Sequence, residues 1–151
     1  MSLALLFVVA ATAFSLILVG GGLYEFLVVD PFWPRRPDLI QPARGGISRK
    51  RFWIPAHVTF ELMLIAALAC AWSFEGIRFW LWVALGSHAL MRLWSAFDFI
   101  PKALAFERAE PASITEAFAR KWTYRSRLRM PLDLITCGAM LAAFAAAVQV
   151  L

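Results

Sequence analysis

The sequence predicts an all-α integral membrane protein: a four-helix bundle that forms a single transmembrane domain over residues 1–151. Of its residues, 62% are hydrophobic and only 17% are charged, whereas soluble domains are about 45–50% apolar and about 25% charged. Its mean hydropathy is +0.70. The apolar residues form four long blocks, and most charged residues lie between them. This composition excludes a soluble catalytic domain, a disulfide scaffold and a disordered chain.

Each apolar block is long enough to cross a bilayer as a helix, because about 20 mostly apolar residues span the ~30 Å hydrocarbon core. The blocks are continuous rather than alternating, which favours helices over a barrel. Residues 1–24 hold no charge and lack the basic start of a secretory signal, so we expect a retained helix. The predicted spans are residues 3–28, 54–73, 77–98 and 131–151.

The basic residues predict the orientation of these spans. Thirteen of the 15 Lys and Arg residues lie in two connections, residues 29–53 and 99–129. The positive-inside rule makes both connections cytoplasmic, so both termini should face outward. The net charge of +5 then reflects topology and attraction to anionic lipid, and no nucleic-acid partner is expected.

The two cytoplasmic connections differ in character. The first holds four prolines before a Gly-Gly pair, which predicts an extended, rigid path with Phe32 and Trp33 at the lipid headgroups. The second has a capping-box spacing at residues 113–116, and no helix breaker follows up to residue 129. An interfacial helix before the last span is therefore predicted, with Ile114, Phe118 and Trp122 on one side.

Ionisable side chains inside the predicted spans are the main functional signal, because such groups are costly in a membrane. All of them fall at the midplane or in its cytoplasmic half, so four helices contribute to one depth zone. The candidate catalytic residues are His57, Glu61 and Glu25, and the candidate ligand-binding residues are Tyr24, His88, Arg92 and Asp133. The competing interpretation is that these side chains only pair with one another and so hold the helices together.

Depth along the helices, at 1.5 Å per residue, separates the candidate partners. Glu61 and Arg92 lie at similar depth and are predicted to form an ion pair, since a buried charge needs a partner. His57 and His88 differ in depth by about 10 Å on this count, which disfavours a bis-histidine haem. Ligation of a haem by a single histidine stays open.

A single metal ion is a further alternative, because helix bundles gather carboxylates and histidines from facing helices around metals. Its ligands would be His57, Glu61 and Glu25. One-carboxylate, two-histidine sets bind iron or similar metals. The sequence requires no cofactor.

The layout also resembles a known family. Four spans fit in a chain of 151 residues, and the first ends in a glycine run before an aromatic-acidic pair. The residues that carry the resemblance are Gly20–Gly22, Tyr24, Glu25, the segment Asp98-Phe99-Ile100-Pro101, Trp122, Arg125, Arg127 and Arg129. In these features the chain resembles the anthrone-oxygenase-like membrane proteins, which are largely of unknown function. The resemblance implies a small integral membrane protein and, by analogy, cofactor-poor oxygenation of a polycyclic substrate.

Two functions of different classes follow as hypotheses. One is a membrane enzyme, an oxidoreductase that takes a lipophilic substrate from the bilayer into a polar pocket. The other is a non-catalytic accessory or assembly subunit of a larger membrane complex. The expected partners are membrane lipids, a lipophilic small molecule and either a protein partner or further copies of this chain. The expected location is the bacterial inner (cytoplasmic) membrane.

Overall fold

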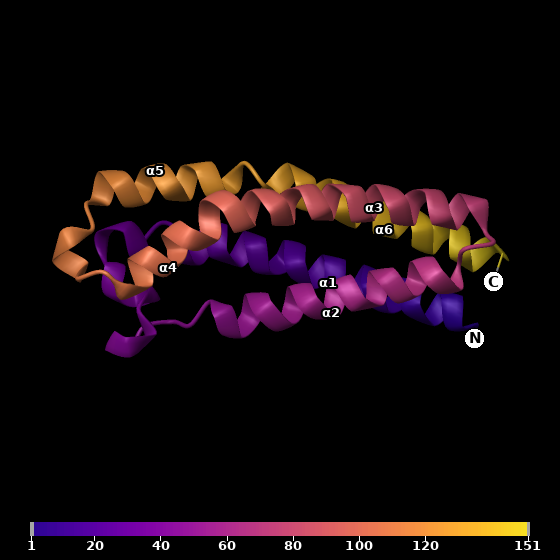
Figure 1. Ribbon diagram of the computed structural model, residues 1–151, viewed down its shortest axis with the longest axis horizontal. Helices are drawn as coiled ribbons and strands as arrows, with labels where there is room; N and C mark the ends of the chain where they lie inside the picture. Colours follow the sequence, from indigo (N-terminus) through magenta and orange to yellow (C-terminus); the bar gives the residue numbers. More distant parts are fainter. Residues whose placement is uncertain (1, 151) are drawn as a thin grey trace.

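The computed structural model describes residues 2–150 and contains helices but no strand over this range. The α-helices are α1 (Leu3–Tyr24), α2 (Lys50–Cys70), α3 (Glu75–Trp94), α4 (Ile100–Arg108), α5 (Glu116–Arg127) and α6 (Met130–Val150). Figure 1 shows α1, α2, α3 and α6 side by side in an elongated bundle, with α4 and α5 at one end. α1 begins and α6 ends at the opposite end. The predicted all-α, four-helix architecture is confirmed.

Three helical stretches are long and apolar enough to cross a membrane: Leu3–Val29, Lys50–Cys70 and Glu116–Val150, with mean hydropathies of 2.6, 1.6 and 1.8. They contain most of the first, second and fourth predicted spans; Leu151 lies outside the described residues. α3, which covers most of the third predicted span, is not among them. Its tryptophans, His88 and Arg92 lower its hydropathy.

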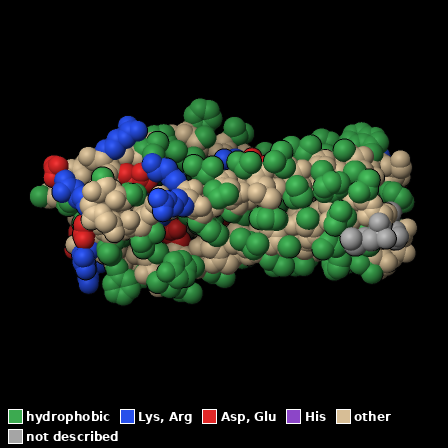
Figure 2. Space-filling view, turned by 90° about the horizontal axis from the view of Figure 1, so that it is seen from below, with side chains coloured by type: hydrophobic (Ala, Val, Ile, Leu, Met, Phe, Trp, Pro, Cys, Tyr) green, Lys and Arg blue, Asp and Glu red, His purple; other side chains and the backbone are tan. Residues whose placement is uncertain are grey.

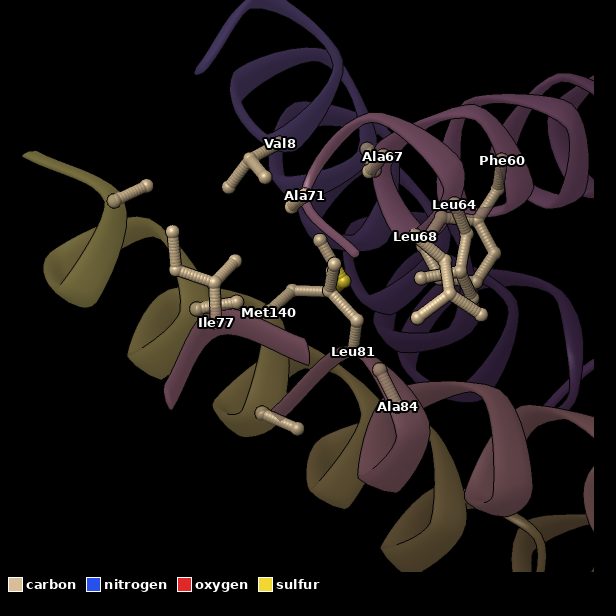
Figure 3. Packing of buried hydrophobic residues seen from close by; sticks show 14 of the residues in the cluster. Val8, Phe60, Leu64, Ala67, Leu68, Ala71, Ile77, Leu81, Ala84 and Met140 are labelled. Atoms are coloured by element: carbon tan, nitrogen blue, oxygen red, sulfur yellow. The ribbon is translucent and has the colours of Figure 1, made fainter. Parts of the chain in front are cut away.

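The core of the bundle is made of interlocking aliphatic and small side chains. Val8, Leu64, Leu81 and Met140 are fully buried and come from four different helices (Figure 3). Alanines such as Ala11, Ala143 and Ala147 are also fully buried. Small side chains let helix backbones approach closely, which is the packing typical of membrane helices. Many large apolar side chains, in contrast, point outward from the bundle.

A second hydrophobic core lies at the other end of the molecule, beyond the bundle. Its buried members are Val29, Trp33, Ile40, Phe99, Phe106, Ala119 and Trp122. The charged side chains gather around this end, while the rest of the visible surface is mostly apolar (Figure 2). The connections 29–53 and 99–129 therefore fold together into one compact layer.

The first connection does not take the predicted extended path. It forms three short 3-10 turns at Trp33–Arg35, Pro37–Ile40 and Pro42–Arg44, because a proline early in each turn loses no needed N–H. Trp33 is fully buried, so its predicted place at the headgroups is wrong. Gly46 closes the segment, where a Cβ would lie 2.2 Å from the carbonyl oxygen of Asp38.

Two π-helical turns flank the junction between the bundle and the second core. η1 (Glu25–Val29) follows α1, and η5 (Ser95–Phe99) joins α3 to α4. Each ends two residues before a proline, Pro31 or Pro101. A proline lacks the N–H for the helical hydrogen bond and clashes with the preceding turn. The helical turn before each proline is therefore widened. α3 continues through η5 into α4, and this continuity was not predicted.

A helix, α5, is present where the interfacial helix was predicted, and its position at a membrane interface stays a prediction. Thr115, rather than Ser113, is its N-cap, and the Thr115 hydroxyl accepts a hydrogen bond from the Phe118 N–H at 3.4 Å. Phe118 is exposed, but Trp122 is buried against Trp33 and Phe106, with ring centroids 5.7 and 5.6 Å apart. One predicted interfacial side chain, Trp122, thus faces protein.

Candidate functional site

A cavity of about 430 Å³ lies where the bundle meets the second core. Its walls come from the end of α1 with η1, the start of α2, the end of α3 with η5 and α4, and the junction of α5 with α6. The volume falls within the ~300–1,000 Å³ typical of small-molecule sites. Both π-helical turns contribute to it, and such turns occur often at functional sites.

The cavity has an apolar mouth between α2 and α4. Ile54 and Val58 line it from α2, and Ile100 and Leu104 line it from α4. Ile54, Val58 and Ile100 are also 59%, 45% and 41% exposed on the outer surface. Hydrocarbon side chains therefore border this mouth, and the exposed Lys50 and its ion-pair partner Glu107 also line the cavity from α2 and α4.

Glu25 is held at one wall by a fixed hydrogen-bond network. Its carboxylate accepts from the Arg49 guanidinium at 3.1 Å and from the Trp53 indole N–H at 3.0 Å. The Arg49 guanidinium in turn lies against the Trp33 and Trp122 rings, at 5.8 and 5.5 Å from their centroids. Such cation–π contacts stabilise a charge that is shielded from water.

The predicted ion pair between Glu61 and Arg92 is present, with Arg92 Nε 3.0 Å from Glu61 Oε1. The same oxygen lies 3.2 Å from Nε2 of the buried His88. One carboxylate oxygen on α2 thus has two partners on α3. The predicted pair therefore links α2 to α3, with Arg92 in the cavity wall.

His57 and His88 lie next to each other, and the predicted 10 Å separation in depth is wrong. Their ring centroids are 5.4 Å apart, and the Trp53 ring stacks on His57 at 5.5 Å. α2 and α3 form a hairpin about Ala71–Phe74, and the two histidines lie equally far from its centre. Counting from the middle of each predicted span missed this symmetry.

Arg129 and Ser95 form a polar contact at the cavity that the sequence did not reveal. The Arg129 guanidinium donates to the Ser95 hydroxyl and, through Nε, to the Ser126 carbonyl oxygen at 3.1 Å. Asp133 lies one helical turn beyond Arg129 and also lines the cavity. The available signal was the i, i+4 spacing of Arg129 and Asp133 across the start of the last span.

Asp30 and Arg127 close the cavity on the side of the second core. Arg127 Nε is 3.5 Å from Asp30, which also accepts from the Trp33 indole N–H at 3.3 Å. Burial, assisted by the nearby Glu25 carboxylate, raises the pKa of Asp30 to about 6, and Arg127 opposes this rise. The Asp30 carboxyl therefore binds a proton more readily than an ordinary aspartate does.

The predicted site residues separate into three groups. Glu25, His57, Arg92 and Asp133 line the cavity, whereas His88 and Glu61 contact its lining residues from behind. Tyr24 is 58% exposed and lines a second recess beside Gly20 and Gly21, which shares Glu25, Arg49 and Trp53 with the cavity. Lining residues outside the prediction include Asp30, Arg49, Trp53, Ser95, Arg127 and Arg129.

The three predicted metal ligands are not gathered around one point. Glu25 faces Arg49 and Trp53, while Glu61 faces Arg92 and His88. Between residues 2 and 150, no three His, Cys, Asp or Glu side chains are grouped as metal ligands would be. His57 and His88 are adjacent, but the Glu61 carboxylate beside His88 is already paired with Arg92.

The fold and site define a helical bundle with a charged cavity that is bordered on one side by exposed apolar residues. Comparisons of the chain with known protein families, with curated proteins and with solved structures find no match. The resemblance to the anthrone-oxygenase-like proteins stays a prediction from the sequence.

Proposed function

We propose that the protein is an integral membrane protein of the bacterial inner membrane, with four spans and both termini outside. Two features support this proposal, the first its spans and the second its orientation. Three of the long helical stretches have the length and hydropathy of membrane spans. The charged side chains of the two long connections gather at one end, as the positive-inside rule requires of a cytoplasmic face (Figure 2).

The orientation predicts the result of reporter fusions. A reporter placed after residue 150 should show a periplasmic signal, and one inserted at Glu110, an exposed residue between α4 and α5, a cytoplasmic signal. Paired alkaline phosphatase and green fluorescent protein fusions measure both. A fusion between α2 and α3, at Ser73, is the matched control and should behave like the one after residue 150. A cytoplasmic signal after residue 150 would overturn the proposed topology.

We further propose that the cavity takes a lipophilic substrate from the bilayer and that His57 serves it as the acid–base group. The single observation that carries this proposal is a cavity with an apolar mouth on one side and an imidazole in its wall. His57 Nδ1 is buried and has no hydrogen-bond partner within residues 2–150. A ring nitrogen without a protein partner is not committed to a structural hydrogen bond, which suits an acid–base role.

The neighbouring residues support His57 in this role. Trp53 and His88 both lie against the His57 ring, and His88 contacts the Glu61 carboxylate. This packing restricts the orientation of the imidazole, which favours proton transfer in one geometry. We propose the oxidoreductase class on the strength of the resemblance, with proton removal from the substrate by His57 as the step these residues perform.

Replacing His57 with glutamine tests this role. Glutamine keeps a polar side chain but cannot exchange a proton near neutral pH, so turnover of the substrate should fall about 100-fold or more while the fold persists. Candidate substrates come from mass spectrometry of lipophilic molecules that copurify with the protein. Tyr24→Phe is the matched control and should retain turnover, because Tyr24 lies outside the cavity. Full turnover by a folded His57→Gln variant would remove the proposal.

A non-catalytic subunit of a larger membrane complex, or a homo-oligomer, is the second candidate. One observation favours it: Phe97 is 83% exposed, and Leu90 and Leu93 on the same stretch are more than half exposed. Large exposed apolar patches mark protein or membrane contacts. This function predicts a stable partner in mild-detergent extracts that is lost in Phe97→Ser, with no molecule retained in the cavity.

A further inference from the structure

Two oppositely charged side chains in the cavity wall have no ionic partner in the protein. Nine charged residues line the cavity, and seven of them form ion pairs. The paired combinations are Glu25–Arg49, Lys50–Glu107, Arg92–Glu61 and Arg127–Asp30. Within residues 2–150, Arg129 and Asp133 are the two lining charges for which no such partner lies within 4.0 Å.

Arg129 is anchored in a way that leaves part of its guanidinium free. Nε donates to the Ser126 carbonyl oxygen and Nη1 to the Ser95 hydroxyl, while the Phe99 ring lies 4.4 Å from the guanidinium carbon. Nη2 makes no hydrogen bond with any residue that the structure describes. The cation is therefore fixed in place with one donor group unused.

Asp133 lies in the first turn of α6, four residues beyond Arg129, and its backbone N–H donates to the Arg129 carbonyl oxygen at 3.3 Å. Its side chain makes no hydrogen bond or ion pair with residues 2–150, and the two residues do not pair with each other. An unpaired charge in a low-dielectric site is costly. A ligand that brings a matching negative and a matching positive group would remove both costs at once.

We propose that the cavity binds an amphiphile with a zwitterionic phosphate–ammonium head. The phosphate accepts hydrogen bonds from Arg129 Nη2, and the ammonium donates hydrogen bonds to the Asp133 carboxylate. Charge-assisted hydrogen bonds of both kinds are among the strongest in proteins. The acyl chain leaves through the apolar mouth formed by Ile54, Val58, Ile100 and Leu104.

This inference rests on the proposed function, since it names the class of lipophilic molecule that the cavity takes. It does not need His57, which lies on α2, whereas Arg129 and Asp133 lie at the junction of α5 and α6. The charge balance favours a zwitterion over an anion. The charges of the seven paired lining residues sum to zero once Glu61, the partner of Arg92, is included. The charges of Arg129 and Asp133 also cancel, so the cavity needs no net charge from its ligand.

The test uses the full chain in nanodiscs of phosphatidylcholine that contain small, equal fractions of phosphatidylethanolamine and phosphatidylglycerol. Lipids retained after transfer to detergent are counted by native mass spectrometry. Phosphatidylethanolamine should be retained at least tenfold over phosphatidylglycerol, and over phosphatidylcholine, whose methylated head has no N–H donor. Arg129→Gln and Asp133→Asn should each reduce this preference roughly tenfold or more, as loss of one charged hydrogen bond does.

Arg125→Gln is the matched control, because Arg125 pairs with Asp98 at 2.6 Å and does not line the cavity. It should leave the preference unchanged. The wild-type comparison of three lipids needs no variant, so it decides the question even if Arg129→Gln fails to fold.

The possible results separate the two proposals. Preferred retention of phosphatidylglycerol, or retention of all three lipids alike, overturns the zwitterion and leaves the cavity function standing. Retention that survives both Arg129→Gln and Asp133→Asn also overturns it. If Val58→Trp, which fills the mouth, changes neither lipid retention nor turnover of the copurified molecules, the proposed function fails as well.

Discussion

Replacing Glu61 with glutamine is expected to destabilise the protein by about 3 kcal/mol, the lower end of the range for breaking a buried ion pair from one side. A single Glu61 oxygen serves both Arg92 and His88, at 3.0 and 3.2 Å. The variant leaves the Arg92 charge without its counter-ion inside the bundle. The side chains of Glu61 and Arg92 are 34% and 36% exposed, which places the effect at the lower end.

This loss of stability should lower both the temperature and the denaturant concentration at which half of the protein is unfolded in detergent. Arg92→Gln should cost a similar amount, and the double variant less than the sum of the two. Glu75→Gln serves as the control, because Glu75 is 90% exposed and lies 3.9 Å from Arg78. Unchanged midpoints in both single variants would show that the pair contributes nothing to stability.

Trp33→Ala is expected to open the second core while the bundle stays folded. Large-to-small changes of a buried tryptophan cost about 3–5 kcal/mol. Trp33 is fully buried, and its ring lies 5.2 Å from that of Phe106 and 5.7 Å from that of Trp122. Its loss also removes one of the two aromatic faces beside the Arg49 guanidinium.

Trypsin is a suitable probe, because several arginines lie in the affected segment, residues 34–49. Cleavage there should become much faster in Trp33→Ala, while circular dichroism of the long helices changes little. Phe32→Ala is the neighbouring control, since Phe32 is 62% exposed and should leave cleavage unchanged. Equal cleavage of Trp33→Ala and the wild-type chain would mean that Trp33 does not hold this layer together.

The helices of the bundle follow from the sequence because long apolar blocks leave few alternatives to helices. The second core could not be predicted in the same way. Its side chains come from two connections far apart in sequence, as the contact of Trp33 with Trp122 shows. Proline-rich composition indicated an extended path, but each proline also suits the first positions of a 3-10 turn. Long-range packing decided between these outcomes.

The site was predictable where a rule of helix geometry applied. Similar depth on adjacent spans identified Glu61 and Arg92 as partners, and the structure contains that ion pair. The same arithmetic separated His57 from His88 because it ignored the hairpin that brings them together. Arg129 was a topology signal and part of the family resemblance but not a predicted site residue, since its anchoring to Ser95 depends on the path of η5.

The two π-helical turns also bear on how relatives of this chain will align with it. A π-turn holds one residue more than an α-helical turn, so each is equivalent to a one-residue insertion. Deletion of that residue from η1 would rotate every following side chain by about 100° and turn Asp30 away from Arg127. A single-residue gap within residues 25–29 or 95–99 would therefore mark a relative with the same bundle but a differently lined cavity.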